Sequence, residues 1–153
     1  MKLKTMATTV LLLVAVLGVC AISCAGPATS FDGERLGACP PSPNCVCSDR
    51  PDGDDGAVIS PLEIPAGVEA GAAFEAFMGL VAERASIESR QDGYFHAVFT
   101  TRILRFRDDF EARLDPAAGV IHVRSASRLG HSDLGANRRR VEDLRSAFLD
   151  SLQ

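Results

Sequence analysis

Lysine is almost absent from this chain. The 153 residues contain 16 basic and 20 acidic side chains, for a net charge of −4, and lysine occurs only at Lys2 and Lys4. Residues 1–23 hold both lysines and no acid, so the remainder carries a charge of −6 (−4 − 2), and all its basic residues are arginine. Bulk binding of nucleic acid needs a positive surface that follows the phosphates. The composition therefore argues against a nucleic-acid partner.

Several patterns of known enzymes and folds are also missing. No cysteine pair has the C-x-x-C spacing of a redox-active dithiol, and no G-x-S-x-G run marks the nucleophile of an α/β-hydrolase. The chain has no internal repeat, and residues 24–153 number only 130 (153 − 23). A chain of that length forms one domain with one core, and not comfortably two.

The first 23 residues resemble an export signal. A short positive segment with Lys2 and Lys4 precedes an apolar core at Val10–Val19, which is the organisation of a signal peptide. The run AISC that ends at Cys24 resembles a lipobox, with alanine where leucine is usual. We therefore predict cleavage before Cys24 by a lipoprotein signal peptidase and a diacylglycerol on its sulfur. The mature protein would then be anchored in the membrane by lipid, on the periplasmic face of the cell envelope.

Two other fates of this segment stay open. Cleavage after Ser23 or Ala25 by the general signal peptidase would release a soluble exported protein. Alternatively, Thr5–Ser23 approaches the ~20 apolar residues that cross a bilayer and would remain as an uncleaved anchor. All three fates place the folded part outside the cytoplasm.

Three further cysteines remain in this oxidising compartment, where thiols pair by default. A bond between Cys39 and Cys45 would close a short proline-rich loop and is the pairing we prefer, whereas a bond between Cys45 and Cys47 would be strained. A zinc site of three cysteines and a histidine is conceivable, but the C-x5-C-x-C spacing matches no familiar zinc pattern. We predict no metal and no cofactor.

Composition and hydrophobic periodicity divide the mature chain into a tether and one domain. Residues 24–57 are rich in Gly, Pro, Asp and Ser and are predicted to form a tether and a cysteine- and proline-rich loop. Residues 58–153 are predicted to form the domain. It opens with an extended piece at Val58–Ile64, which Pro61 confines to a sheet edge. A helix follows at Pro65–Arg84, where apolar residues recur at helical spacing.

Three strands and a second helix complete the domain. Apolar and polar residues alternate at Tyr94–Thr101, Asp109–Leu114 and Val120–Ala126, and a fourth strand can begin at Ile87. The spacing of apolar residues predicts an amphipathic helix at Leu134–Leu152. This order of elements predicts an α+β fold, an antiparallel β-meander with two helices packed on one face as a two-layer sandwich.

The richest polar stretch is residues 124–145, which hold six arginines, three acids, three serines, a histidine and an asparagine. In an extended strand Arg124 and Arg128 share one face. Ile121 and Val123 share the other, which should pack on the helices. The two arginines are therefore predicted to project from the face opposite the helices.

The turn after this strand leads to the start of the last helix, where Ser132 or Asp133 supplies the N-cap. Free backbone donors at a helix N-terminus, with arginines nearby, are a natural anion site. Our first hypothesis is therefore a non-enzymatic site for an anionic group, such as a lipid head group, a cell-wall carboxylate or an acidic partner. Its candidate residues are Arg124, Ser125, Ser127, Arg128, Asp133, Asn137 and Arg138.

Two other hypotheses use the same region. In one, the arginines pair with Asp108, Asp109 and Asp133 and form an internal salt-bridge network that supports the fold. In the other, Ser127 and Asp133 act with a histidine in a hydrolase, which requires these side chains to converge within hydrogen-bond reach. Asp108 and Asp109 are adjacent on a strand and point to opposite faces, so they do not form an acid–base dyad by themselves.

Two segments resemble the signatures of a known family, the domain of unknown function 1499. One is CPPSPNCV, which begins at Cys39, and the other is RSASR, which begins at Arg124 and continues through SDLGANR to Arg138. FRDD at Phe106 and YFHA at Tyr94 also fit the family pattern.

The resemblance covers residues 36–149 and implies an exported or membrane-associated protein, in a family without an assigned biochemical activity. This chain departs from the family pattern at Cys47, where serine is usual, and at His131, where an aromatic residue is common. The motif residues carried over are Cys39, Asn44, Cys45, Asp108, Asp109, Arg124, Ser125, Ser127, Arg128, Asp133, Asn137 and Arg138.

Overall fold

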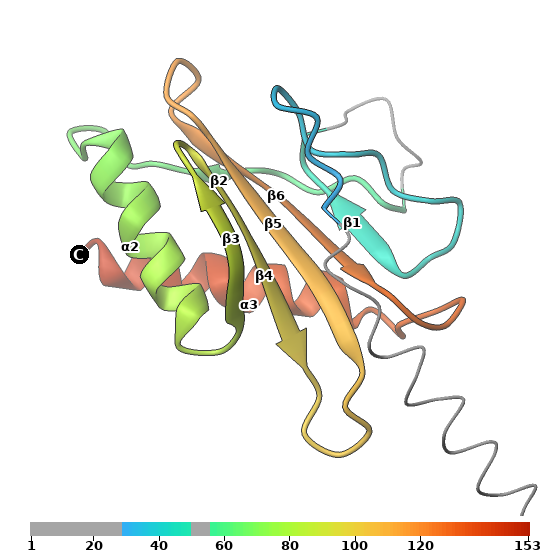
Figure 1. Cartoon of the computed structure of the whole chain (residues 1–153). Helices are drawn as coiled ribbons and strands as arrows, with labels where there is room; N and C mark the ends of the chain where they lie inside the picture. The colour runs from blue at the N-terminus through green and yellow to red at the C-terminus, as the bar shows by residue number, and fades with distance from the viewer. Residues whose placement is uncertain (1–28, 50–55) are drawn as a thin grey trace, which may run out of the picture.

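The computed structural model of the chain describes residues 29–49 and 56–153. The predicted signal segment at residues 1–23 and the predicted lipid site at Cys24 lie outside the described residues. The described part forms a six-stranded antiparallel sheet with two helices on one face (Figure 1). This confirms the predicted α+β fold with its meander and its two layers.

The four longer strands form the meander, each paired with the next. They are β3 (Ser86–Gln91), β4 (Tyr94–Thr100), β5 (Arg107–Asp115) and β6 (Val120–Ser127). Two short strands, β1 (Cys45–Cys47) and β2 (Leu62–Glu63), both pair with the outer edge of β6. Each of these two short strands therefore covers a different part of the outer edge of β6.

Strand β3 forms the opposite edge of the sheet and has no second partner among the described strands. Five of its six side chains are exposed, and these include Glu88 and Arg90. The pairing register shifts between Ile87 and Ser89, as in a β-bulge. Charges and bulges are features of a strand edge that does not recruit another strand.

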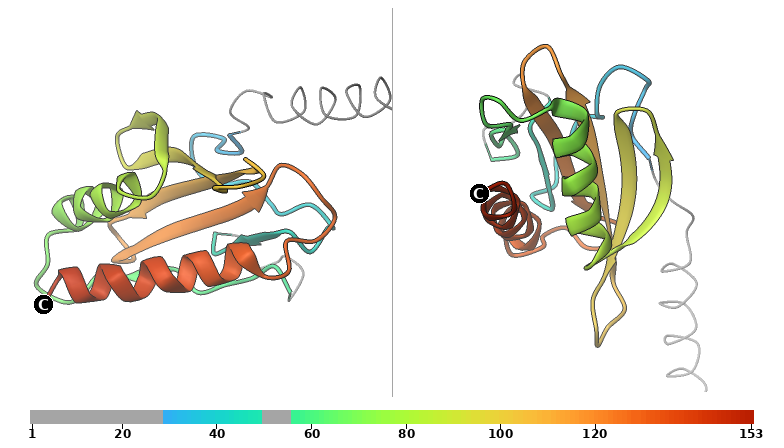
Figure 2. Two further views of the ribbon diagram at one scale, coloured as in Figure 1. Left: turned by 90° about the horizontal axis from the view of Figure 1, so that it is seen from below. Right: turned by 90° about the vertical axis from the view of Figure 1, so that its left-hand side faces the viewer.

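Helices α2 (Ala70–Ala82) and α3 (Ala136–Ser151) cover the same face of the sheet, as the two views of Figure 2 show. Phe77 of α2 is fully buried at the centre of this layer. Its ring centroid lies 6.1 Å from that of Phe95, 6.2 Å from that of Phe110 and 5.3 Å from that of Phe148. The main core is therefore an aromatic cluster between the helices and β4 and β5.

Helix α2 begins five residues later than the sequence predicts. Val68 N donates to Pro65 O at 3.1 Å in a turn before the helix. The carboxylate of Glu69 then accepts hydrogen bonds from Gly71 N at 2.9 Å and from Ala72 N at 2.6 Å. A carboxylate that satisfies the first free backbone donors is a favourable N-cap. Capping by Glu69 therefore sets the start of α2.

Helix α3 also begins later than predicted, at Ala136. Leu134 has a left-handed backbone (φ 54) and is 85% exposed, so its predicted place on the apolar face of the helix is wrong. Asp133 does hold the start of the helix, because its carboxylate accepts from Gly135 N at 2.9 Å and Asn137 N at 2.7 Å. The N-cap itself is Gly135, with no side-chain hydrogen bond of its own.

The segment before the meander is more ordered than the predicted tether and loop. Cys39 and Cys45 form the predicted disulfide, with their Cα atoms 5.6 Å apart. The residues from Cys45 to Cys47 then form β1, so the loop prediction is wrong there. Three residues are too few to show a strand period in a sequence. Within the described residues, no helix is long and apolar enough to span a membrane.

Candidate functional site

The sheet face that points away from the helices is polar. Side chains alternate along a strand, so the neighbours of the core residues Phe95, Phe110 and Val123 point to this second face. Segment 29–38, in blue in Figure 2, lies on this side of the sheet, opposite α3, and is called the covering segment below. The polar side chains here are Tyr94, His96, Asp109, Glu111, Arg113, His122, Arg124 and Arg128.

Glu111 lies at the centre of this polar face and is fully buried. Its Oε1 accepts from Ser30 N at 2.8 Å and from the Tyr94 hydroxyl at 2.9 Å. Its Oε2 accepts from Ser30 Oγ at 2.6 Å and from Arg124 Nη1 at 3.1 Å. Burial and the charge of Glu111 raise the pKa of Tyr94, which keeps its phenol a hydrogen-bond donor. Glu111 thus fastens the covering segment to β4 and β6.

Asp109 anchors a second group on the same face. It accepts from His96 Nε2 at 2.7 Å and from two nitrogens of Arg128, Nη2 at 2.7 Å and Nε at 2.9 Å. Burial opposes ionisation of Asp109, but the hydrogen bonds from His96 and Arg128 outweigh it and lower the pKa of the carboxyl group. The hydrogen bond to Asp109 likewise raises the pKa of Arg128. Asp109 and Arg128 therefore form a bidentate ion pair.

Two nitrogens on this face are buried without a hydrogen-bond partner among the described residues, Nδ1 of His96 and Nε of Arg124. Their residues flank Glu111 in the strand register, on β4 and β6. Buried polar atoms are satisfied in most proteins. The hydrogen-bonding capacity of this face is therefore almost fully used by the described residues, with these two atoms as exceptions.

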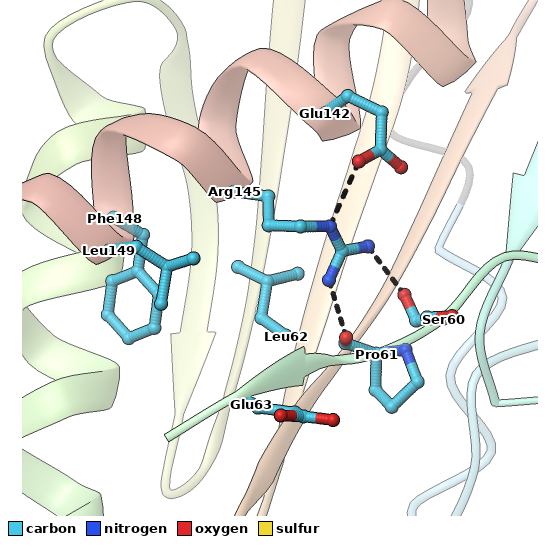
Figure 3. Close-up of a pocket in the computed structure, with 8 residues that line it drawn as sticks. All are labelled: Ser60, Pro61, Leu62, Glu63, Glu142, Arg145, Phe148 and Leu149. Carbon is cyan, nitrogen blue, oxygen red and sulfur yellow. Dashed lines mark hydrogen bonds and ion pairs between the residues drawn. The ribbon is translucent and has the colours of Figure 1, made fainter. Parts of the chain in front are cut away.

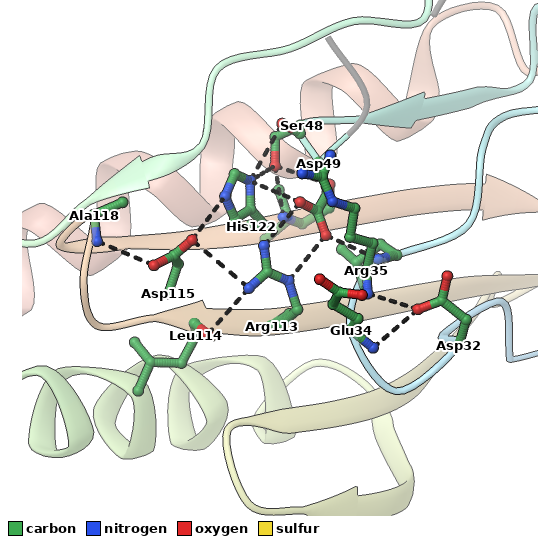
Figure 4. Close-up of polar contacts among 12 residues, drawn as sticks. Asp32, Glu34, Arg35, Ser48, Asp49, Arg113, Leu114, Asp115, Ala118 and His122 are labelled. Carbon is green, nitrogen blue, oxygen red and sulfur yellow. Dashed lines mark hydrogen bonds and ion pairs between the residues drawn. The ribbon is translucent and has the colours of Figure 1, made fainter. Parts of the chain in front are cut away.

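A third group surrounds Asp49, which follows β1 (Figure 4). Asp49 accepts from Arg113 Nε at 2.9 Å, from Arg113 Nη2 at 2.8 Å and from Leu36 N at 2.8 Å. Burial opposes its ionisation, but the hydrogen bonds from Arg113 and Leu36 outweigh that effect and lower the pKa of Asp49. This group ties the covering segment to β5.

His122 lies between two carboxylates in the same group. Its Nδ1 is 3.8 Å from Asp49 Oδ1 and 3.2 Å from Ser48 O, and its Nε2 is 4.0 Å from Asp115 Oδ2. Asp115 in turn accepts from Ala118 N at 3.0 Å in the β5–β6 turn. Figure 4 shows this chain of contacts running from the turn to the covering segment.

Asn137 forms the hub of a separate cluster on the helix side of the sheet. Its side-chain oxygen accepts from Ser125 Oγ at 2.6 Å. Its side-chain nitrogen lies 2.9 Å from Asn44 O, 3.0 Å from Ser127 Oγ and 2.8 Å from Asp133 Oδ2. Asn137 is fully buried, and its hydrogen bonds join α3 to β6 and to the residue before β1.

Arg140 extends this cluster to β5. Its Nη2 donates to Asp108 Oδ2 at 2.5 Å, and its Nη1 donates to Ser125 Oγ at 2.9 Å and also to Asn137 Oδ1. Its guanidinium carbon lies 4.6 Å from the centroid of the Phe99 ring, in a cation–π geometry. Arg140 was outside the predicted set of ligand-binding residues, although it lies in the same run of arginines.

Family comparison places most of the chain in one known family. The model of a protein family of unknown function, DUF1499, matches residues 35–148, which are 114 (148 − 34) of the 153 residues. The chain belongs to the DUF1499 family. No curated protein and no solved structure matches it.

The DUF1499 domain divides the predicted ligand-binding residues between the two faces of the sheet. Arg124 and Arg128 lie on the polar face, as predicted, and each forms an ion pair with a carboxylate. Arg124 pairs with Glu111, which was not among the aspartates predicted as partners. The remaining candidates lie on the helix side of the sheet or on α3; they are Ser125, Ser127, Asp133, Asn137 and Arg138. The seven candidate residues therefore do not form one site.

Arg138 differs from the buried arginines because it is exposed. Its Nη2 donates to Gly56 O at 2.9 Å and to Val58 O at 3.2 Å. It lines a small cavity of about 130 Å³ together with Asp133, Gly135 and the proline-rich loop at residues 40–43. Arg124 and Arg128 line neither this cavity nor the larger ones that the described residues form around α3 and β3.

The hydrolase hypothesis finds no matching contact among the described residues. Ser127 Oγ and Asp133 Oδ2 are both bonded to the amide nitrogen of Asn137. His131 is exposed in the β6–α3 loop. His96 and His122 belong to the opposite face of the sheet, where their partners are Asp109 and Ser48.

Sequence reasoning missed the residues that hold the polar face together, above all Glu111 and Asp49. A usable signal exists for Glu111. It lies between Asp109 and Arg113 on a strand whose alternate residues are apolar, so charges recur with period two on one face. Charges at that spacing in a strand with neighbours on both sides require partners. Asp49 offers no such signal, because its pairing depends on the path of the covering segment.

Across a cavity between β2 and α3, Arg145 of α3 contacts the backbone at the sheet edge (Figure 3). The cavity has a volume of about 340 Å³ and is lined by Leu62, Phe148 and Leu149, among others. Arg145 crosses it, donating from Nη1 to Pro61 O at 2.5 Å and from Nη2 to Ser60 O at 2.7 Å. The backbone carbonyls before β2 are therefore satisfied by a side chain of α3.

Proposed function

We propose that this DUF1499 domain is a non-enzymatic module of the cell envelope, anchored by a lipid on Cys24, and that its buried arginines serve the architecture. The ion pairs of Arg124, Arg128 and Arg140 support this proposal best. Each guanidinium is mostly buried and lies against a carboxylate of β5. A foreign anion would have to displace those carboxylates.

The network also explains why an exported domain of this size carries so many buried charges. Glu111, Asp49 and Asn44 each join the segment at residues 29–49 to the sheet or to the β6–α3 loop. That segment contributes little to the main core. Its attachment therefore rests on hydrogen bonds, ion pairs and a small apolar cluster in which Phe31 and Leu36 pack with Tyr94 of β4. The proposed role of the signature residues is to hold the N-terminal segment rigidly on the domain.

The test is the stability of an Arg128→Ala variant of the full chain, measured by urea unfolding. Removing one partner of a buried ion pair costs about 3–5 kcal/mol, because the other charge is left buried and unpaired. We expect a loss of that size. Arg102→Ala is the matched control, since Arg102 is an exposed loop residue and its removal should change stability by less than about 0.5 kcal/mol.

A change of less than about 0.5 kcal/mol for Arg128→Ala would contradict the architectural role. The anchor is tested separately by the intact mass of the exported protein. The proposal expects the mass of a chain that begins at Cys24 and carries a diacylglycerol. A mass without lipid would refute the anchor and leave the architectural role untouched.

A narrower form of the anion-binding hypothesis concerns Arg138. This arginine is exposed, and it lines the cavity with Asp133 and the backbone of Gly135 at the start of α3. A small phosphate or carboxylate group would bind Arg138 there in competition with the carboxylate of Asp133, which already accepts from Gly135 N. The check is a thermal-shift titration with inorganic phosphate. An increase in Tm that disappears in Arg138→Ala would support the site, and no increase would remove it.

A further inference from the structure

The β4–β5 loop exposes apolar side chains that the fold does not need. Ile103 is 90% exposed, Leu104 is 64% exposed and Phe106 is 38% exposed. The loop is closed at its base, where Thr101 N donates to Phe106 O and Phe106 N donates to Thr101 Oγ1, both at 2.9 Å. Its apolar tip is therefore held outward by an ordered base. In Figure 1 this loop projects beyond the end of the sheet.

Positive charges flank the apolar tip. The four residues between Thr101 and Phe106 are Arg102, Ile103, Leu104 and Arg105, and none of the six from 101 to 106 is acidic. The loop thus carries a charge of +2 in a mature chain whose net charge is −6. Arg102 and Arg105 are both exposed. Apolar side chains between arginines are the pattern of a segment that enters an anionic membrane surface.

A second exposed apolar residue lies at the same end of the sheet. Leu134, 85% exposed, belongs to the β6–α3 loop. That loop leaves β6 beside the start of β5, where Arg128 N donates to Arg107 O at 3.2 Å. Arg139 is exposed there too and donates to Leu134 O at 2.8 Å. The exposed Leu134 and the exposed Arg139 at the start of α3 therefore repeat, near the β4–β5 loop, its combination of apolar and basic side chains.

The length of the tether brings this end within reach of the bilayer. Ser30 is hydrogen-bonded to Glu111, which lies opposite His96 in the register between β4 and β5. Ser30 comes six positions after Cys24 in the sequence, so a lipid on Cys24 would hold Ser30 within about 20 Å of the membrane surface. From His96, β4 runs about 13 Å to Thr100, and the loop extends beyond. The loop tip and the anchor can therefore touch one membrane together.

We infer that the tip of the β4–β5 loop inserts Ile103 and Leu104 into the surface of an anionic phospholipid bilayer, with Arg102 and Arg105 at the head groups. This deepens the proposed function, because it names the surface that the anchored module contacts. The ion-paired network on the polar face then has a mechanical use. It fixes the covering segment, where the described chain begins, relative to the loop.

The experiment places an environment-sensitive fluorophore on the full exported chain through Ile103→Cys. The native cysteines of the lipidated mature chain do not interfere, since Cys24 would carry the lipid, Cys39 and Cys45 are bonded and Cys47 is buried. Asp92→Cys is the matched control, because Asp92 is exposed in the β3–β4 turn at the other end of β4. Each labelled protein is reconstituted into vesicles of neutral phospholipid, with and without anionic phospholipid, and with bromine-labelled acyl chains as quenchers.

We expect a shift to shorter wavelength and quenching by the acyl chains at position 103, in anionic vesicles only, with neither change at position 92. Emission at position 103 typical of water in every vesicle would overturn the proposal. A wavelength shift without quenching would also overturn it, because the tip would then contact a second copy of the chain or another part of the protein.

Two further variants test the charges. Arg102→Ala should lower the ratio of inserted to free loop about fivefold, and Arg102→Ala with Arg105→Ala about 25-fold, since each arginine near an anionic surface contributes about 1 kcal/mol. Equal insertion in both variants would refute the head-group contact. Because these readouts report only the loop, they stay distinct from the anchor, which the intact mass tests, and from the network, which Arg128→Ala tests.

Discussion

The two faces of the sheet are held by different forces. The helix-covered face is an aromatic and aliphatic core around Phe77, Phe95 and Phe110, whose attraction has no preferred direction. The opposite face is held by directed contacts to Glu111, Asp109 and other carboxylates. An apolar core tolerates changes of shape and resists changes of volume. A face built from ion pairs fails when one partner is lost, whatever the volume.

The difference shows what each face contributes. The apolar face supplies the stability of the fold, as in most domains. The polar face fixes where one particular segment lies, because its acceptors must meet particular donors at residues 29–49. The family signature residue Asn44 belongs to the second task, because it donates to Gly130 O, whereas Asp109 and Arg128 join β5 to the end of β6.

The largest effects come from adjacent residues of β5 that point to opposite faces. Phe110→Ala should cost about 3–5 kcal/mol through the cavity it leaves. Glu111→Ala should cost about 3–5 kcal/mol through the buried guanidinium of Arg124 that it leaves unpaired. Urea unfolding of both variants measures the free energies. A small loss for Glu111→Ala beside a large loss for Phe110→Ala would break the comparison, since the polar face would then be dispensable.

A smaller effect should follow from opening the disulfide that closes the proline-rich loop before β1. Replacing Cys39 and Cys45 together by serine should lower stability by about 2 kcal/mol, because the closed loop is short. The measurement is the Tm of the double variant. Reduction of the wild-type protein is the control and should give the same decrease. An unchanged Tm in both would mean that the closed loop adds nothing to stability.

Loss of the carboxylate at the start of α3 should have a still smaller effect. Asp133→Ala removes the acceptor of Gly135 N and Asn137 N and should cost about 1 kcal/mol. Asp92→Ala, in an exposed turn, is the matched control and should stay within about 0.5 kcal/mol. A loss for Asp133→Ala near that of Glu111→Ala would show that the helix-side cluster matters as much as the polar face.

The smallest effect concerns how the stability of the wild-type protein depends on pH. The pKa values of Asp109 and Asp49 are lower in the folded protein than their ordinary values. Their contribution is therefore fully present above the unfolded-state pKa of about 4, and it is lost as the pH falls through the folded-state values. Urea midpoints between pH 7 and pH 2.5 should fall in acid. The fall should be weaker in Asp109→Asn, and an equal slope would contradict the assignment.

The meander was predictable from sequence because its strands alternate clearly. Apolar and polar residues alternate along Tyr94–Thr100 and, within β5, from Asp109 to Leu114. Strand β1 has only three residues, which are too few to show a period, so the sequence alone does not predict its pairing with β6.

The candidate site was less predictable than the fold. The strand period gave the correct face for Arg124 and Arg128, since that depends on local geometry alone. It did not give their partners, because the choice between Asp109 and Glu111 depends on the register between β5 and β6. Nor did it place Arg138, which lies on α3 and contacts the segment before β2.

The outer edge of β3 has a consequence for proteins crowded on one surface. Copies that share a membrane meet in two dimensions, where an open strand edge would invite them to join edge to edge into fibres. The alternating charges of Glu88 and Arg90, together with the register shift after Ile87, make that docking unfavourable. With the proposed lipid anchor, copies of the chain would lie close together on a membrane without joining edge to edge.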